Sequence, residues 1–247
     1  MTTASSTNAL QRVLDETRQR FVDTFLAQCD SIRVLVDDVA ADGPNDPLAA
    51  LTQVSHRLCG LAGMIGFPTI GARASELEGL AGNAGRGAFD AARARHIVDA
   101  MRDAFTSELA SATAWPPAPA SGAHDAKAGV TVVVAEDDPD ITRIIDAQVR
   151  AAGYTVITAP DGEQALAAVR EHRTDVLVLD LMMPRLNGFD VLMQVRKLPA
   201  PRPRIVVLSA RGREQDVMRA FDLGADDYMT KPFNPQELVA RVARLLR

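Results

Sequence analysis

Residues 175–184 have the sequence Asp-Val-Leu-Val-Leu-Asp-Leu-Met-Met-Pro. An apolar run of this length that ends on a carboxylate is typical of a strand buried on both faces of a parallel sheet. Asp180 closes the run and enters an apolar environment, where burial penalises a carboxylate that has no partner. The stretch therefore predicts a buried strand with a functional carboxylate at its end.

Similar apolar runs recur through residues 130–247, and helical patterns separate them. The expected strands are 130–135, 155–158, 175–180, 204–209 and 226–229. The expected helices are 139–152, 161–172, 188–197, 213–223 and 234–246. This alternation predicts an α/β domain whose parallel sheet is covered by helices, with its site beyond the carboxyl ends of the strands.

The expected strand ends carry the chemically active side chains, which are Glu136, Asp137, Asp138, Asp180, Ser209 and Lys231. Carboxylates gathered at one edge repel one another, and a divalent cation relieves that repulsion. Oxygen ligands with room for water suit Mg²⁺, and a lysine beside them favours a phosphoryl group. For Asp138 and Asp140, capping of a helix that begins at Pro139 is an equally good explanation.

Residues 130–247 resemble a response-regulator receiver domain over their whole length. The matching motifs are Glu136-Asp137-Asp138, Leu-Asp180-Leu-Met-Met-Pro, Ser209-Ala210 and Tyr228-Met-Thr-Lys231-Pro232. The resemblance implies a flavodoxin-like (βα)5 fold with the parallel strand order 2-1-3-4-5. It also implies a cis peptide between Lys231 and Pro232.

The resemblance implies a role for each site residue. Asp180 is the expected phosphoacceptor, and Mg²⁺ is expected on Glu136, Asp137, Asp180 and the backbone carbonyl of Met182. Lys231 is expected to pair with the phosphoryl group, Ser209 to donate a hydrogen bond to it, and Tyr228 to turn inward as Ser209 moves. Such a domain catalyses its own phosphorylation and dephosphorylation and has no conventional substrate turnover.

The last expected helices and strand carry charges that resemble the dimer face of receivers in transcription factors. These residues are Arg219, Asp226, Asp227, Glu237, Arg241 and Arg244. The resemblance implies a symmetric homodimer linked to phosphorylation, with an ordinary solvated face as the alternative.

Residues 1–112 contain apolar residues at helical spacing and no β-branched runs of the kind that form strands. Helices are expected from residue 8, over 47–66, over 69–83 and over 88–112, and their short connections predict an antiparallel four-helix bundle. Residues 113–129 are rich in Pro, Ala, Gly and Ser, which predicts a semi-extended linker. The expected organisation is thus an all-α domain at 1–112, a linker at 113–129 and the α/β domain at 130–247.

The second expected helix contains an unusual face around His56. At about 100° per residue, Gly60 and Gly63 lie near His56 and the apolar stripe lies opposite, so the imidazole is expected to face solvent. Each glycine costs about 1 kcal/mol relative to alanine in a helix. Two glycines on this face therefore predict that a partner approaches it closely.

The region resembles the histidine phosphotransfer (HPt) family, whose histidine is followed by Leu at +2 and Gly at +4, here Leu58 and Gly60. The resemblance implies that His56 carries a phosphoryl group. The family usually has Lys at +3, where this chain has Cys59, and residues 1–112 contain no lysine. The implied partners are sensor or hybrid histidine kinases and other receiver or HPt proteins.

Composition excludes several other classes. The net charge of −5 gives no general electrostatic case for binding nucleic acid. No apolar stretch approaches the roughly 20 residues of a membrane span, and Met1–Asn8 lacks the pattern of a signal peptide. The two cysteines, Cys29 and Cys59, have no paired spacing, which favours a reducing cytoplasm.

Three functional hypotheses remain. The first is an HPt–receiver protein of a His–Asp phosphorelay. The second is a pseudo-HPt scaffold joined to a receiver that gates protein–protein interaction. The third is the regulatory portion of a longer effector such as a diguanylate cyclase, although the sequence ends at Arg247, where the last helix is expected to close.

Overall fold

The computed structural model describes residues 3–41, 46–84, 89–111, 129–210 and 214–247. The chain divides into two compact units, each described here by itself: a helical unit that begins at Asp15 and a unit built on a sheet. Apart from Gly129, the linker expected at 113–129 lies outside the described residues. The domain boundaries therefore stay predictions, while the elements within them can be compared with the sequence.

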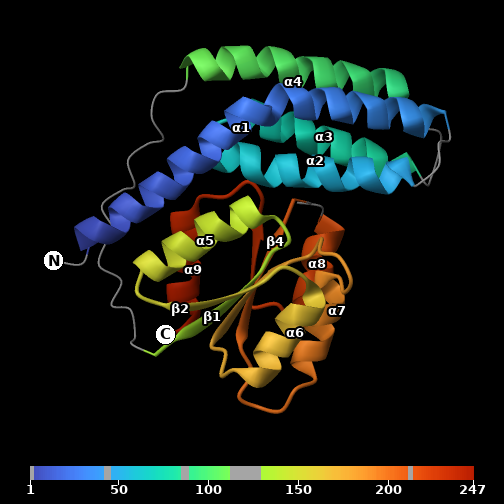
Figure 1. Ribbon diagram of the computed structural model, residues 1–247. Helices are drawn as coiled ribbons and strands as arrows, with labels where there is room; N and C mark the ends of the chain where they lie inside the picture. Colours follow the sequence, from blue (N-terminus) through green and yellow to red (C-terminus); the bar gives the residue numbers. More distant parts are fainter. Residues whose placement is uncertain (1–2, 42–45, 85–88, 112–128, 211–213) are drawn as a thin grey trace. The chain divides into compact units, whose positions relative to one another are not determined.

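The N-terminal helices form the expected bundle (Figure 1). They are α1 (Thr3–Ala40), α2 (Pro47–Met64), α3 (Pro68–Asn83) and α4 (Ala91–Ser111). Asp46 caps α2, because its Oδ1 accepts a hydrogen bond from the Ala49 amide at 3.1 Å, and Pro47 occupies the first turn, where its missing N–H costs nothing.

Aromatic rings and ion pairs hold the bundle together. The rings of Phe25 and Phe105 lie 4.8 Å apart, centroid to centroid, and Phe67 joins the same cluster. Arg95 pairs with Asp37 at 2.7 Å, and Arg102 pairs with Asp30. Asp30 precedes Asp37 along α1, whereas the partner of Asp30 follows the partner of Asp37 along α4. These two helices therefore run antiparallel.

The second unit is a parallel sheet with the predicted strand order 2-1-3-4-5. Its strands are β1 (Thr131–Ala135), β2 (Thr155–Ala159), β3 (Val176–Asp180), β4 (Arg204–Ser209) and β5 (Asp227–Thr230). Its helices are α5 (Pro139–Ala151), α6 (Gly162–Glu171), α7 (Gly188–Arg196), α8 (Glu214–Asp222) and α9 (Pro235–Leu245). All ten elements occur where the sequence predicted them.

Both faces of this sheet are covered (Figure 1). Helices α5 and α9 lie on one face, and α6, α7 and α8 lie on the other. Every residue of β3 is buried, as its continuous apolar run predicted. The adjacent strands β1 and β3 therefore deliver their last residues to one edge of a rigid sheet.

Along the described part of the chain, no helix combines the length and the apolar character that a membrane crossing requires.

Candidate phosphotransfer sites

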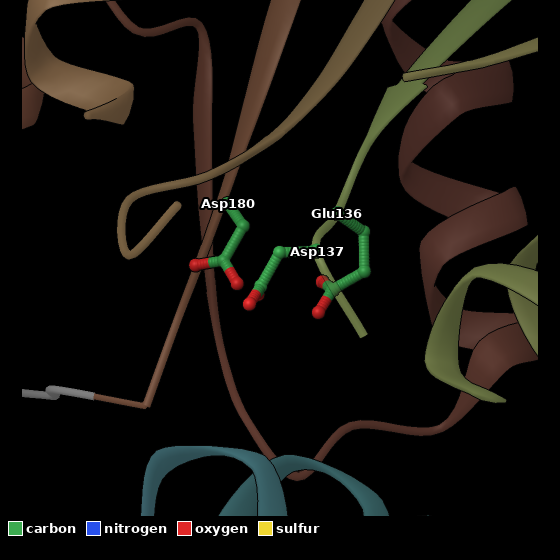
Figure 2. A group of neighbouring side chains, drawn as sticks. All are labelled: Glu136, Asp137 and Asp180. Atoms are coloured by element: carbon green, nitrogen blue, oxygen red, sulfur yellow. The ribbon is translucent and has the colours of Figure 1, made fainter. Parts of the chain in front are cut away.

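Three carboxylates meet at the carboxyl ends of β1 and β3. One ligand oxygen from each of Glu136, Asp137 and Asp180 lies within 4.8 Å of the other two, and Figure 2 shows the three side chains together at this edge. Glu136 and Asp180 are buried, and Asp137 is half-buried. Such a set of hard oxygen donors fits Mg²⁺, the ion that receiver domains bind in their active sites.

Lys231 is the cation of this cluster. Its Nζ donates to both oxygens of Glu136 at 2.9 and 2.7 Å and to Oδ2 of Asp180 at 2.6 Å. Burial raises the pKa of Glu136 to about 8, against the opposing effect of the ammonium group. Burial alone would lower the pKa of Lys231, but the nearby Asp180 and Glu136 carboxylates outweigh it and raise that pKa. The lysine therefore stays charged between the two carboxyl groups.

The surrounding backbone holds the expected phosphoacceptor. The Met182 amide donates to Oδ1 of Asp180 at 3.0 Å, and the Lys231 amide donates to the Ser209 carbonyl at 2.8 Å. The peptide between Lys231 and Pro232 is cis, as the resemblance implied. Asp138 does not join the cluster: it caps α5 and accepts hydrogen bonds from the amides of Asp140 and Ile141.

Ser209 is the last residue of β4, and Tyr228 is the second residue of the neighbouring strand β5. Both side chains are buried. Burial raises the pKa of the Tyr228 hydroxyl, and a side-chain hydrogen bond with Ser209 opposes that rise. The two residues expected to form a switch are therefore in direct contact, and Tyr228 packs within the apolar core of the sheet unit.

His56 does not face solvent, so that prediction is wrong. Only 4% of the residue is exposed, and its Nδ1 lies 3.3 Å from Oε1 of Glu78 on α3. A Cβ placed on Gly71 of α3 would lie 3.2 Å from the backbone nitrogen of Gly63 and 3.4 Å from the carbonyl oxygen of Cys59. Helix α3 thus packs closely on the side of α2 that the helical wheel had left to solvent.

The two glycines of α2, Gly60 and Gly63, lie in different surroundings. Gly63 lies at the close contact between α2 and α3, which gives it a packing reason within the helical unit. Gly60 is buried on the same helix. That a partner docks over Gly60 and Gly63 stays a prediction. Cys59, which stands where related histidine helices carry lysine, is a buried thiol.

Comparison with known proteins identifies both units. Residues 16–112 match the Hpt domain family, and residues 132–243 match the response regulator receiver domain family. The chain joins an Hpt domain to a receiver domain. These are the domains from which two-component phosphorelay proteins are built.

Several individual proteins are similar to about half of this chain. The alkaline phosphatase synthesis transcriptional regulatory protein PhoP of Bacillus subtilis is 42% identical over 116 residues, which are 47% of this chain and 48% of that protein. The transcriptional regulatory protein CpxR of Klebsiella pneumoniae is 41% identical over 116 residues, 47% of this chain and 49% of that protein. The receiver domain of Francisella response regulator 1452 is 35% identical, with a TM-score of 0.46, over 48% of this chain and 97% of that one. The chain spans about half the length of the curated relatives it matches.

The charged residues expected on a dimer face of the receiver domain are paired within the chain. Asp227 accepts from Arg241 at 2.9 Å and from Arg244 at 2.8 Å, while Arg241 also contacts Glu237. Asp226 pairs with Arg196 and Arg204, away from the other members of the set. The guanidinium of Arg219 lies 4.2 Å from the centre of the Phe189 ring. The sequence did not predict these partners, and the role of the residues in a dimer stays a prediction.

Two features of the site were missed at the level of sequence. Glu78 lies one residue after the buried Leu77 in α3, and its helical position gave no sign that it faces His56. Met218 and Phe221 are 56% and 44% exposed, which is unusual for large apolar residues, and they belong to α8, one of the two helices of the expected dimer face. The signal available in the sequence was the i, i+3 spacing of these two apolar residues, which brings them close together on the surface of a short helix.

Glu78 gives a direct prediction for the Hpt domain. If its carboxylate keeps the imidazole proton on Nδ1, then Glu78→Ala should slow phosphoryl transfer to His56 by about 10²-fold, within the range of a lost acid–base partner. Glu78→Gln, whose amide oxygen can still accept from Nδ1, should retain most of the rate. Single-turnover transfer from a phosphorylated receiver measures both, and equal loss in the two variants would contradict a purely orienting role.

Proposed function

We propose that Asp180 accepts a phosphoryl group and that His56 exchanges one with partner receivers. The observation that carries the first step is the Asp180 carboxylate, held by the Met182 amide on one oxygen and by Lys231 on the other. An Asp180 oxygen forms a bond to phosphorus as the bond from phosphorus to the donor breaks. With acetyl phosphate as donor, acetate leaves with the electron pair, and no proton transfer is needed.

The carboxylates of Glu136, Asp137 and Asp180 and the carbonyl of Met182 would hold Mg²⁺. Bound there, the ion neutralises charge on the transferring phosphoryl group. Lys231 would pair with a phosphoryl oxygen and Ser209 would donate a hydrogen bond to another, which stabilises the charge that develops during transfer. Each role rests on a position at the same edge of the sheet.

In the Hpt domain, the contact with Glu78 supports an imidazole protonated at Nδ1. The lone pair then lies on Nε2, which would attack the phosphorus of an aspartyl phosphate while the acyl oxygen leaves. Sensor or hybrid histidine kinases, other receivers and other Hpt proteins are the proposed partners.

The test is phosphoryl transfer to the full chain and to its His56→Gln and Asp180→Asn variants. Acetyl phosphate with Mg²⁺ should label the wild type and His56→Gln, and Asp180→Asn should lose the hydroxylamine-sensitive label entirely. A phosphorylated partner receiver should add an acid-labile label to Asp180→Asn but not to His56→Gln. Label on Asp180→Asn from acetyl phosphate, at a site other than His56, would refute the assignment of Asp180.

A second candidate for the helical unit is a pseudo-HPt scaffold that docks a partner without accepting phosphate. Two observations favour it: Cys59 replaces the usual lysine, and His56 is buried. In that case no partner receiver transfers label to His56, yet a receiver still binds the helical unit. The labelling experiment therefore separates the two candidates.

We propose further that phosphorylation shifts the population of the receiver domain toward a dimer formed through α8, β5 and α9. The face carries both acids and arginines, so two copies related by a twofold axis can exchange the ion pairs of Asp227 and Glu237 between chains. The pair of Arg241 and Glu237 is partly exposed, and exposed pairs contribute only about 0–1 kcal/mol each, so the exchange of that pair costs little. Met218 and Phe221 add the apolar contact area.

The dimer proposal is tested by analytical ultracentrifugation with and without acetyl phosphate and Mg²⁺. Phe221→Ala should weaken phosphorylation-dependent dimerisation by at least about tenfold, because a buried aromatic anchor carries a large share of an interface's energy. Val34→Ala, which shortens another exposed apolar residue on α1, is the control and should dimerise as wild type. A phosphorylated wild type that stays monomeric would overturn the proposal.

A further inference from the structure

Arg185 stands out in the loop that follows the phosphoacceptor strand. This loop runs from Leu181 to Asn187, between β3 and α7. The φ angle of Arg185 is +66°, in the left-handed region that side chains other than glycine rarely adopt. A residue keeps such a conformation only where its surroundings hold it.

The side chain of Arg185 is held by Asp161, at the start of α6. Its guanidinium makes an ion pair and a hydrogen bond to Oδ2 of Asp161. Asp161 is fully buried and also caps α6, since its Oδ1 accepts from the Gln164 amide at 2.8 Å. The hydrogen bond from Arg185 holds the pKa of Asp161 below its usual value. An ionised, buried carboxylate thus anchors a side chain that is itself 51% exposed.

The two loops also touch through their backbones. A Cβ on Gly162 would lie 2.7 Å from the carbonyl carbon of Leu186, so the contact accepts only glycine at residue 162. The Leu186 amide donates to the Pro184 carbonyl at 2.8 Å and tightens the turn that contains Arg185. The loop is therefore fixed to the start of α6 by one ion pair and one backbone contact.

The same loop orients the phosphoacceptor. The Met182 amide donates to Oδ1 of Asp180 at 3.0 Å, and the Gly188 amide donates to the Leu181 carbonyl at 3.0 Å. Because Met182 lies between Asp180 and the anchored residue, displacement of the loop moves its amide away from the carboxylate. It also moves the carbonyl expected to bind Mg²⁺.

We propose that Arg185 and Asp161 are positioning residues of the receiver reaction. Their ion pair fixes the loop 181–187, so that Met182 holds Asp180 in the orientation for attack on phosphorus. The proposal rests on the proposed role of Asp180 as phosphoacceptor. Neither Arg185 nor Asp161 is a ligand or a nucleophile; they act through the loop.

The test uses the full chain in a His56→Gln background, so that Asp180 is the one expected acceptor. Arg185→Gln should lower the rate of phosphorylation by acetyl phosphate about tenfold and weaken Mg²⁺ binding in calorimetry by a similar factor, as lost outer partners of metal ligands do. Arg185→Lys should recover part of both losses. Arg150→Gln is the matched control, because Arg150 is 52% exposed and pairs with Asp146 on α5, away from this loop.

Asp161→Asn provides the second variant, because asparagine caps a helix as well as aspartate but cannot pair with Arg185 as an ion. It should show the same losses, and the double variant Asp161→Asn/Arg185→Gln should be no worse than either single one. Unfolding curves should show that each variant keeps its fold. Hydrogen exchange should show that the Met182 amide loses protection in the same variants.

The proposal is overturned if Arg185→Gln binds Mg²⁺ and reacts as the control does, or if the two single losses simply multiply in the double variant. Failure of the proposed function has a different signature. If Asp180 accepts no phosphoryl group in the wild type, the Mg²⁺ affinities and the Met182 exchange still report on the ion pair.

Discussion

Lys231→Met should destabilise the receiver domain strongly in the absence of Mg²⁺ and almost abolish its phosphorylation. The substitution removes the ammonium that lies 2.6–2.9 Å from the buried carboxyl groups of Asp180 and Glu136. Loss of one partner from a buried ion pair typically costs about 3–5 kcal/mol. The loss should fall near the lower end, because the raised pKa of Glu136 allows that carboxyl to take up a proton.

Mg²⁺ should stabilise this variant more than it stabilises the wild type, since the ion replaces the missing positive charge. Urea unfolding with and without saturating Mg²⁺ measures the difference. Phosphorylation should not recover, because a lost donor to the developing charge costs about 10²–10³-fold in rate.

Lys197→Met is the matched control for this prediction. Lys197 is exposed at the C-terminal end of α7, and its removal should leave stability and the response to Mg²⁺ within about 0.5 kcal/mol of wild type. If Lys231→Met unfolds at the wild-type urea concentration in the absence of Mg²⁺, then Lys231 does not balance the two carboxyl groups.

The receiver site was predictable from sequence because each of its parts is fixed by the sheet. Asp180 closes a continuous apolar run, and parallel strands bring such ends to one edge, so Glu136 and Lys231 had to lie near it. The place of each residue at the end of its strand therefore predicted where its side chain lies in the folded domain. The same reasoning cannot find Arg185 and Asp161, whose contact depends on the path of two loops.

The surroundings of His56 show where such reasoning fails. A helical wheel describes the faces of α2 but not which neighbour covers each one. The face of His56 is covered because Gly71 lets α3 approach the backbone at Gly63 and Cys59 closely, and Glu78 then reaches Nδ1 of the imidazole. That approach joins residues on two helices, and no periodicity within one helix encodes it. The partners of Asp226 and Asp227 were unpredictable for the same reason.

Gly188→Ala should disrupt the phosphoacceptor site through the backbone alone. A Cβ at residue 188 would lie 2.7 Å from the Cα of Leu181 and would overlap the carbonyl oxygen of Asp180. Neither atom is the flexible end of a side chain, so β3 or the start of α7 must shift. Overpacking of this kind costs about 1–3 kcal/mol, and a displacement of about 1 Å at a reacting group costs about 10²-fold in rate.

The measurement is the free energy of unfolding together with the rate of phosphorylation by acetyl phosphate, both relative to wild type. Gly79→Ala is the matched control, because nothing lies within 4 Å of a Cβ at residue 79 in the interior of α3. Relief of the glycine penalty should there raise stability by about 0.5–1 kcal/mol and leave Asp180 unaffected. Replacement of glycine by alanine is thus expected to lower stability at residue 188 and to raise it at residue 79. A Gly188→Ala protein as stable and as reactive as wild type would show that α7 yields to the added methyl group without moving Asp180.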